Sequence, residues 1–348
     1  MIRPRLSVFT RSTFSVFLYS LFLCIGFVWA QSEPLNYNDA LAQALESNAD
    51  VLTAQVDLAS AERDLARLEA DPLALRIPLL QVQNAVENAQ KTLQIAELSA
   101  QNAVATAYAE ALEADTTLQL GEAQRAIAET QLSATQIRIE AGASTALDVD
   151  RAQNTLRNAE RDVADAREAK ALAYSRLASL LALSETPSLS DTVPNVAVPP
   201  LDEVYAQLES NAQLVAARQS VALSEAQVAA IDNAFSAKAD IDAAKDDLDN
   251  ARTRLRETER SLRLSLRQSY NGVVAAQSRV QRAEADLKTS QENLDAQQVR
   301  YDAGSISLLE LENSRVEVLS AQASLQTARH SLANGLRQLT LSTEGGGL

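Results

Sequence analysis

An internal duplication limits the fold of this 348-residue chain more than any other feature of its sequence. Residues 45–49, Leu-Glu-Ser-Asn-Ala, recur as residues 208–212, at an offset of 163. Residues 138–142 and 300–304 match at an offset of 162, reading Arg-Ile-Glu-Ala-Gly in the first copy and Arg-Tyr-Asp-Ala-Gly in the second. Matches this far apart at nearly one offset indicate two equivalent halves with almost no insertion in either.

The duplication predicts how the chain is divided. We expect a first helical repeat at residues 31–183 and a second at residues 203–341. A linker at residues 184–202 joins them, and its four prolines favour an extended backbone. Residues 342–348 include three glycines and are predicted to form a flexible tail.

The first thirty residues differ from the rest. Three arginines precede an apolar run, Phe14–Trp29, and polar residues follow Ala30. This pattern is typical of a secretory signal peptide, here residues 1–30, cut after Ala30. The alternative is an uncleaved membrane anchor, but the run is short for a helix that spans a bilayer, which needs about 20 residues. The single cysteine, Cys24, lies in this segment, so no disulfide is expected after cleavage.

Composition and periodicity predict long helices in both halves. The chain has 9 glycines and 8 prolines, and only 4% of its residues are aromatic, so burial is expected in thin seams of alanine and leucine. In the second half the apolar residues follow heptad spacing, with a shift at Leu266: Ile241, Ala244, Leu248, Ala251, Leu255, Leu262, Val273, Ala276, Val280, Ala283, Leu287, Leu294 and Tyr301. The first half has the same spacing at Leu93, Ala96, Ala100, Ala103, Ala107 and Ala114. The predicted fold is all-α, with two tandem repeats of long antiparallel coiled-coil helical hairpins.

A glycine marks the predicted hairpin turn in each repeat. Gly142 is followed by Ser144 and Thr145, and Gly304 is followed by two serines. Glycine adopts the left-handed conformation that ends a helix, and a hydroxyl accepts hydrogen bonds from the free N–H groups that begin the next one. From the residues alone, each turn is simply the connection between two helices.

These stretches resemble the TolC-like outer-membrane efflux proteins. The resemblance rests on residues 138–149 and 300–311 around the two turns and on the opening segment 41–48, and it covers almost all of residues 35–340. It implies a homotrimer in which two helical hairpins from each protomer form a periplasmic tube, an α-barrel. It also implies that an adaptor protein docks at the glycine turns and that an inner-membrane transporter drives export.

One part of the family pattern is missing from the sequence. Family members insert a pair of transmembrane strands in each half, and each strand needs about 9–11 residues to span. The corresponding breaks here are residues 71–78 and about 230–240, which leave no room for such a pair. We therefore predict that the transmembrane β-barrel is absent, and direct insertion into the outer membrane is not expected.

The resemblance also suggests residues at the tip and its gate. The candidates are Gly142, Asp148, Tyr301, Gly304 and Glu310. Two neighbouring positions depart from the family pattern: Asn313 replaces an acidic residue and Ile306 replaces a basic one, so a thinner acidic ring is expected. Without the resemblance, Tyr301 would be interpreted as a residue packed in the seam, Gly304 as a turn residue and Glu310 as a solvated surface residue.

A second candidate tip lies in the first break. It contains five large apolar residues that are predicted to contact a membrane or a partner, or else to be buried in a turn that caps the bundle: Leu73, Leu75, Ile77, Leu79 and Leu80.

The sequence offers no set of residues for catalysis or for a cofactor. His330 is the only histidine, and without a second histidine or a cysteine nearby it cannot build a usual zinc site; we expect it at the surface near a helix end. The many carboxylates alternate with arginine and lysine on helix faces, as on solvated helices. The net charge of −15 argues against nucleic-acid binding.

The sequence thus predicts a non-enzymatic, exported protein of the periplasm or of the outer-membrane-associated envelope. The first hypothesis is a TolC-like conduit in an export or efflux system, with passive passage gated at the glycine-turn tip. The alternative is a non-conducting structural or tethering coiled-coil protein of the cell envelope. A periplasmic adaptor ranks last because the β-rich modules that flank an adaptor hairpin are not evident.

Overall fold

The computed structural model describes residues 34–190, 193–194 and 196–346. The predicted signal peptide, residues 1–30, lies outside them. The described residues form α-helices, one short 3-10 helix and no strand; a single parallel bridge pairs Leu35 with Leu189. The predicted all-α fold is confirmed.

The helices follow the order that the duplication predicts. Their bounds are α1 Tyr37–Ser47, α2 Ala49–Glu69, α3 Arg76–Glu140, α4 Ala146–Leu180, α5 Leu201–Gln207, the 3-10 helix η1 Leu208–Ser210, α6 Ala212–Ile231, α7 Lys238–Asp302 and α8 Leu308–Glu344. Helices α3 and α7 each have 65 residues, and their first residues, like those of α4 and α8, are separated by the repeat offset. The two halves are therefore structural repeats as well as sequence repeats.

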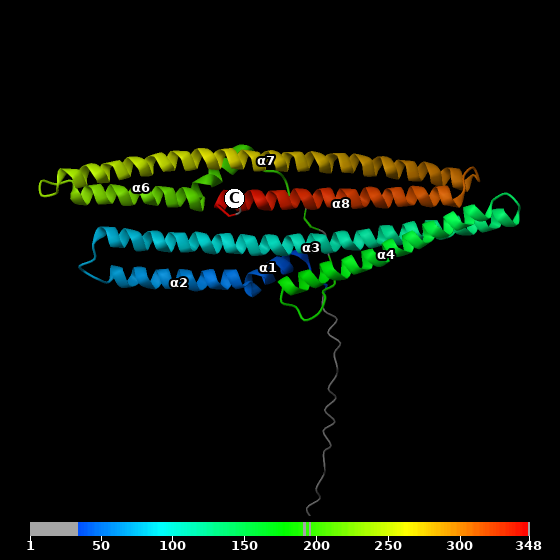
Figure 1. The fold of residues 1–348 in the computed structure, drawn as a ribbon, viewed down its shortest axis with the longest axis horizontal. Coiled ribbons are helices and arrows are strands. Elements are labelled where there is room, and N and C mark those ends of the chain that lie inside the picture. Colours follow the sequence, from blue (N-terminus) through cyan, green and yellow to red (C-terminus); the bar gives the residue numbers. More distant parts are fainter. Residues whose placement is uncertain (1–33, 191–192, 195, 347–348) are drawn as a thin grey trace, which may run out of the picture. The chain divides into compact units, whose positions relative to one another are not determined.

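Each long helix packs against two shorter ones. Helix α3 contacts α2 and α4, and α7 contacts α6 and α8 (Figure 1). The halves meet mainly where α3 packs against α8, with further contacts between α3 and α6. No helix among the described residues is long and apolar enough to cross a membrane.

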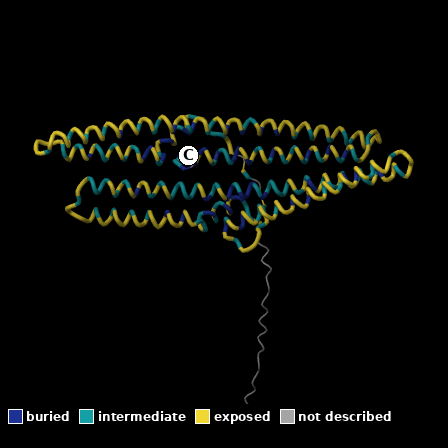
Figure 2. The backbone as a smooth tube through the Cα atoms, in the orientation of Figure 1, coloured by how far each residue is buried: buried dark blue, intermediate teal, exposed yellow. Residues whose placement is uncertain are grey.

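The core is thin, as the small side chains predict, and it is concentrated near the middle of the helices (Figure 2). The α7 seam is confirmed at its centre, where Leu262, Val273 and Val280 are buried. In the first half the predicted Ala100 and Ala107 are buried, but Ala103 is exposed and the neighbouring Val104 is buried instead. Helix α3 touches more helices than α7 does, so a single heptad seam does not describe its buried surface.

Two tyrosines at equivalent positions form hydrogen bonds with the segments that precede α1 and α5. The hydroxyl of Tyr108 in α3 donates to the Leu35 carbonyl at 3.2 Å, and that of Tyr270 in α7 donates to the Pro199 carbonyl at 3.1 Å. Tyr108 is fully buried and packs edge-on against Tyr37, with ring centroids 5.5 Å apart. The same tether therefore occurs once in each repeat.

The repeated Leu-Glu-Ser-Asn segment forms a joint between helices. In the second repeat the Asn211 side chain accepts from the N–H groups of Gln213 and Leu214 at the start of α6. Its amide nitrogen donates to the carbonyls of Ser342 and Thr343 at the end of α8, at 3.1 Å each. One buried side chain thus begins α6 and satisfies the end of α8.

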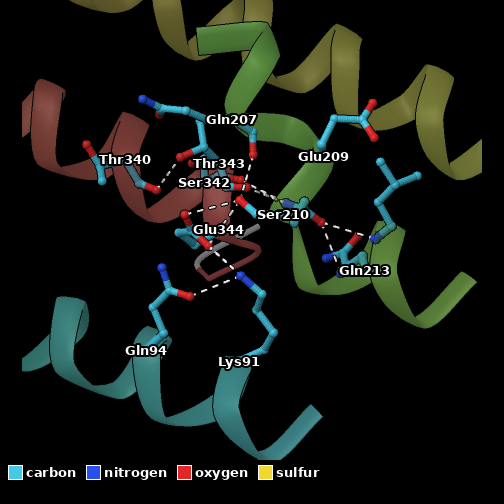
Figure 3. Close-up of polar contacts among 12 residues, drawn as sticks. Lys91, Gln94, Gln207, Glu209, Ser210, Gln213, Thr340, Ser342, Thr343 and Glu344 are labelled. Carbon is cyan, nitrogen blue, oxygen red and sulfur yellow. Dashed lines mark hydrogen bonds and ion pairs between the residues drawn. The ribbon is translucent and has the colours of Figure 1, made fainter. Parts of the chain in front are cut away.

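An ion pair links the long helix α3 to this joint. Lys91 Nζ lies 3.2 Å from a Glu344 carboxylate oxygen, and the Ser210 hydroxyl donates to the same carboxylate (Figure 3). Only 18% of the Lys91 side chain and 14% of the Glu344 side chain are exposed. The joint therefore connects both repeats through charged groups that are largely shielded from water.

Three expectations are corrected by these contacts. The tail predicted from residue 342 is wrong at its start, because α8 continues to Glu344 and Thr343 is buried by the joint. The linker ends slightly earlier than residue 202, since α5 begins at Leu201. His330 is not at the surface: it is 6% exposed within α8, and its Nδ1 lies 2.8 Å from a Glu113 carboxylate oxygen of α3.

Candidate functional site

The turn between α3 and α4 ends one helix with a glycine in the left-handed region. Gly142 has φ +72°, a conformation that side chains with a Cβ rarely adopt. Its N–H donates to the Ile139 carbonyl at 2.9 Å, and the Ala143 N–H donates to the Arg138 carbonyl at 2.8 Å. This pair of bonds is a Schellman motif, which satisfies carbonyls that the helix end would otherwise leave free.

The same turn begins α4 with a capping box. The Thr145 hydroxyl accepts from the Asp148 N–H at 3.3 Å, and the Thr145 N–H donates to the Asp148 carboxylate at 3.0 Å. The hydroxyls of Ser144 and Thr145 also donate to that carboxylate, and Arg151 lies 3.7 Å from it. Asp148 is therefore held by its own turn rather than pointing freely into solvent.

The turn between α7 and α8 repeats this construction. Gly304 has φ +68°, and its N–H donates to the Tyr301 carbonyl at 2.8 Å. The Ser307 N–H donates to the Glu310 carboxylate at 2.8 Å, and the Ser307 hydroxyl accepts from the Glu310 N–H at 3.2 Å. The structure thus brings Tyr301, Gly304 and Glu310 together in one turn, and Gly142 and Asp148 in the other.

The two capping carboxylates are negatively charged at neutral pH. Hydrogen bonds from the hydroxyl and the N–H of Thr145 lower the pKa of Asp148, and those from the N–H and the hydroxyl of Ser307 lower the pKa of Glu310. Each bond favours the ionised form. General acid–base catalysis near neutral pH needs a pKa near that pH, so neither group suits that role. What each turn offers instead is a rigid, negatively charged tip.

Exposed apolar side chains lie close to both turns, and sequence reasoning missed them. Leu147 at the start of α4 is 57% exposed and Leu308 at the start of α8 is 47% exposed. Ile137 and Val299, which match at the repeat offset, are 65% and 69% exposed in the last turns of α3 and α7. The signal was available in the sequence: large apolar residues recur at the repeat offset outside the predicted seam.

The second candidate tip is divided by the start of α3. Leu73 and Leu75 lie in the connection before the helix and are 83% and 71% exposed. Ile77, Leu79 and Leu80 belong to the first turns of α3 and are half-buried, so the five residues do not form one exposed tip. Their contact with a membrane or a partner stays a prediction. Leu79 and Leu80 line a hollow shared with α6.

The connection between α6 and α7 also exposes an apolar side chain that the sequence pattern did not single out. Phe235 is fully exposed. It is the repeat equivalent of Leu73, so the offset of 162 could have found it. Among the residues that the structure describes, no group of three or more histidine, cysteine, aspartate or glutamate side chains could hold a metal ion.

Comparison with known sequences decides the family. The sequence pattern of the outer membrane efflux protein family matches residues 74–183 and 229–344, one stretch in each repeat. The chain belongs to this family. Comparison with curated proteins gave no match.

Solved structures with the same fold include several outer-membrane channels. The Campylobacter jejuni channel CmeC superposes with a TM-score of 0.64 at 12% identity, covering 89% of this chain and 86% of that one. The Vibrio cholerae protein VceC gives 0.60 at 15% identity, covering 89% and 96%. The open state of the Neisseria gonorrhoeae channel MtrE gives 0.62 at 16% identity, covering 89% and 89%. At these identities the likeness shows a shared fold, and family membership supports an envelope location and a part in an efflux channel.

Proposed function

We propose that this chain is the subunit of a homotrimeric, TolC-like helical conduit in the periplasm. The conduit works with a periplasmic adaptor protein and an inner-membrane transporter, and it is gated at the glycine-turn tip. Passage through it is passive, and the transporter supplies the energy. The observation that carries the proposal is the pair of equivalent turns, each with a Schellman motif, a capping box and an ionised carboxylate, in a chain of the efflux family.

Trimer formation is supported by apolar surface along the helices. Leu172 on α4 is 72% exposed and Leu264 on α7 is 61% exposed, although both lie within long helices rather than at their ends. A thin core leaves such residues in water in a single protomer. Association of copies around a closed axis would bury them.

Adaptor docking is supported by the chemistry of the turns. Leu147 and Leu308 each lie beside a rigid turn and are available for apolar contact. The rigid turns fix the position of these side chains, so little conformational entropy is lost on docking. In a trimer, Asp148 and Glu310 would bring six carboxylates to the tip, where mutual repulsion would favour the open state unless a partner or tight packing holds it closed.

Particle imaging of the purified protein tests the proposal. We expect trimers with a central channel by electron microscopy, and a trimeric mass by mass photometry. A Leu172→Asp/Leu264→Asp variant should shift the mass towards monomer, whereas Gln291→Asp, at an exposed residue of α7, should not. A monomer without a channel would overturn the conduit and would support a non-conducting tethering protein of the envelope instead.

A further inference from the structure

A cavity of about 470 Å³ lies where the two repeats meet beside the linker. This linker cavity is walled by parts of α1, α3, α5, α8 and the linker, and its lining includes Tyr37, Leu41, Val204, Leu336 and Arg337. Tyr37 and Leu41 belong to the hydrophobic cluster of the first repeat, whereas Val204 and Leu336 belong to that of the second. Small-molecule sites have volumes of roughly 300–1,000 Å³. The cavity therefore has room for a small organic ligand.

The lining of the linker cavity is mostly apolar and carries one charge. Val193, Pro194 and Leu339 add to its apolar wall. Among the described residues that line it, Arg337 of α8 is the only charged one. The wall thus holds a cation and no carboxylate that would neutralise it.

The hydrogen bonds of Arg337 go to neutral groups. Its Nε donates to the Asn102 side-chain oxygen at 3.2 Å, and its Nη1 donates to the Tyr37 hydroxyl at 3.0 Å. Its Nη2 is shielded from solvent and has no hydrogen-bond partner among the residues that the structure describes. These contacts hold the side chain in place but leave its positive charge without a counter-charge.

The surroundings of Arg337 disfavour that charge. Desolvation lowers the pKa of the guanidinium, and the hydrogen bond with Tyr37 offsets this only in part. An arginine nevertheless stays protonated in a protein. A charge that is removed from water without a partner of opposite sign is costly. An anion in the cavity would remove this cost.

The repeat does not require an arginine at this place. At the offset of 162, the first repeat has Ser175 of α4 in the position of Arg337. The position of Asn102 is likewise taken by Leu264 in the second repeat. The same helical architecture is therefore built once with this cation and once without it. An uncompensated charge that the fold does not need points to an anion from outside the protomer.

We propose that the linker cavity binds an organic carboxylate with a hydrocarbon tail, such as a fatty acid. The tail lies against the apolar walls, and the carboxylate pairs with Arg337 as the guanidinium turns its Nη2 towards the ligand. Arginine pairs with carboxylates through parallel, charge-assisted N–H bonds. A phosphate dianion suits the site less well, because the lining offers a single cation and few polar partners.

Isothermal titration calorimetry with a series of ligands tests the chemistry of the site. Decanoate, kept below the concentration at which it forms micelles, should saturate a single site per protomer. Decanol has the same tail without the charge and should bind at least about tenfold more weakly, because it loses the charge-assisted bonds. Acetate, which lacks the tail, and decyltrimethylammonium, which has the opposite charge, should not saturate the protein. Equal binding of decanoate and decanol, or no saturation by decanoate, would overturn the proposal.

Substitution of Arg337 tests the role of its charge. Arg337→Gln should weaken decanoate binding at least about tenfold and leave decanol binding unchanged, which also shows that the cavity is still folded. Arg329→Gln removes an exposed arginine of the same helix, paired with Glu284 at 2.9 Å, and should bind decanoate like the parent protein. A purely structural Arg337 would give the variant the same preference for decanoate over decanol as the parent, and that result would contradict the carboxylate site.

Filling the cavity tests its location without changing Arg337. Thr340 lines the cavity from an exposed position of α8, so Thr340→Trp should occupy part of it with little effect on the core. The binding of decanoate and of decanol should both weaken at least about tenfold, because the tail loses apolar wall. Gln338→Trp, at an exposed position of the same helix outside the lining, is the matched control and should bind like the parent. Equal binding by the two variants would place the ligand elsewhere.

The outcomes separate this proposal from the conduit, because the linker cavity is formed within one protomer. A trimeric channel that binds no decanoate would refute the carboxylate site and leave the conduit standing. A monomer that binds decanoate through Arg337 would refute the conduit and support the site.

Discussion

The side-chain amide of Asn211 donates to the carbonyl of Thr343 at 3.1 Å, although the two residues are 132 positions apart. The same side chain also accepts from two N–H groups at the start of α6 and is fully buried. Free N–H groups at a helix start and free carbonyls at a helix end both need partners. Asn211 serves both ends at once, which makes α6 and α8 abut at the joint.

Replacing Asn211 should therefore cost more than losing an ordinary helix cap. We expect Asn211→Ala to lower the free energy of unfolding by about 2–4 kcal/mol, because it removes a cap and leaves buried carbonyls without donors. Asn48 is the repeat equivalent and caps only the start of α2, through the N–H groups of Asp50 and Val51. Asn48→Ala should cost about 1 kcal/mol. Urea unfolding followed by circular dichroism measures both, and equal losses would contradict the double role.

The sequence revealed the repeated Leu-Glu-Ser-Asn segment but not the joint. Capping residues can be recognised locally, because their partners lie two or three residues away. The carbonyls of Ser342 and Thr343 lie more than a hundred residues away, so no local pattern predicts that they meet Asn211. For the same reason, residues 342–344 read as a tail, and His330 read as a surface residue although Glu113 of α3 covers it.

The positions of the helices and the turns could be predicted from the sequence far better than the joint could. Heptad spacing placed the long helices, and glycine followed by hydroxyl residues placed both turns that the structure shows at Gly142 and Gly304. Of the proposed tip residues, Asp148 and Glu310 proved to be capping partners, a role that their spacing from Thr145 and Ser307 already allows. The roles of these residues in gating stay a prediction.

Substitution of the glycines at the two turns should destabilise the protein for a conformational reason alone. Gly142 and Gly304 have positive φ, and a Cβ added at either would have no heavy atom within 4 Å, so an alanine there meets no clash but an unfavourable backbone. We expect Gly142→Ala and Gly304→Ala each to lower the free energy of unfolding by about 1 kcal/mol. Gly272, inside α7 and also without close neighbours, is the control. Gly272→Ala should stabilise by about 0.5–1 kcal/mol, and a loss there like that at the turns would contradict the reasoning.

The capping carboxylate of Glu310 should make the stability of its turn depend on pH. Folding lowers the pKa of Glu310 through the bonds from Ser307. Ionised Glu310 therefore stabilises the turn fully at pH values above its unfolded pKa, which is about 4. This contribution is lost as the pH falls through the lowered pKa of the folded state. The thermal midpoint of the parent should exceed that of Glu310→Gln at neutral pH, and the difference should vanish in acid.

Glu312 supplies the comparison for that measurement. It lies on the same helix and pairs with Arg315 at 2.7 Å outside the capping box. Glu312→Gln should change the midpoint little at either pH, since exposed ion pairs contribute weakly. A constant difference between parent and Glu310→Gln across the titration would show that the charge of the cap is not what stabilises the turn.

The ion pair between Lys91 and Glu344 should behave differently from the pairs on the solvated faces. Both side chains are less than one-fifth exposed, so removing one partner leaves the other charge shielded from water. Lys91→Met should lower the free energy of unfolding by about 1–3 kcal/mol, because the Glu344 carboxylate then keeps only the Ser210 hydroxyl. Lys91→Met/Glu344→Gln should recover most of this loss, since no unpaired charge remains.

An exposed pair provides the matched control for this cycle. Arg67 and Asp64 lie 2.9 Å apart, but their side chains are 81% and 53% exposed. Arg67→Met should therefore change the free energy of unfolding by less than about 0.5 kcal/mol, and the effect should shrink further in high salt. If Lys91→Met changed the free energy of unfolding as little as Arg67→Met, and with the same sensitivity to salt, the pair of Lys91 and Glu344 would behave as a surface contact. The link between α3 and the joint of α6 with α8 would then depend on apolar packing and on other polar contacts, such as the bond from Gln219 of α6 to Glu87 of α3.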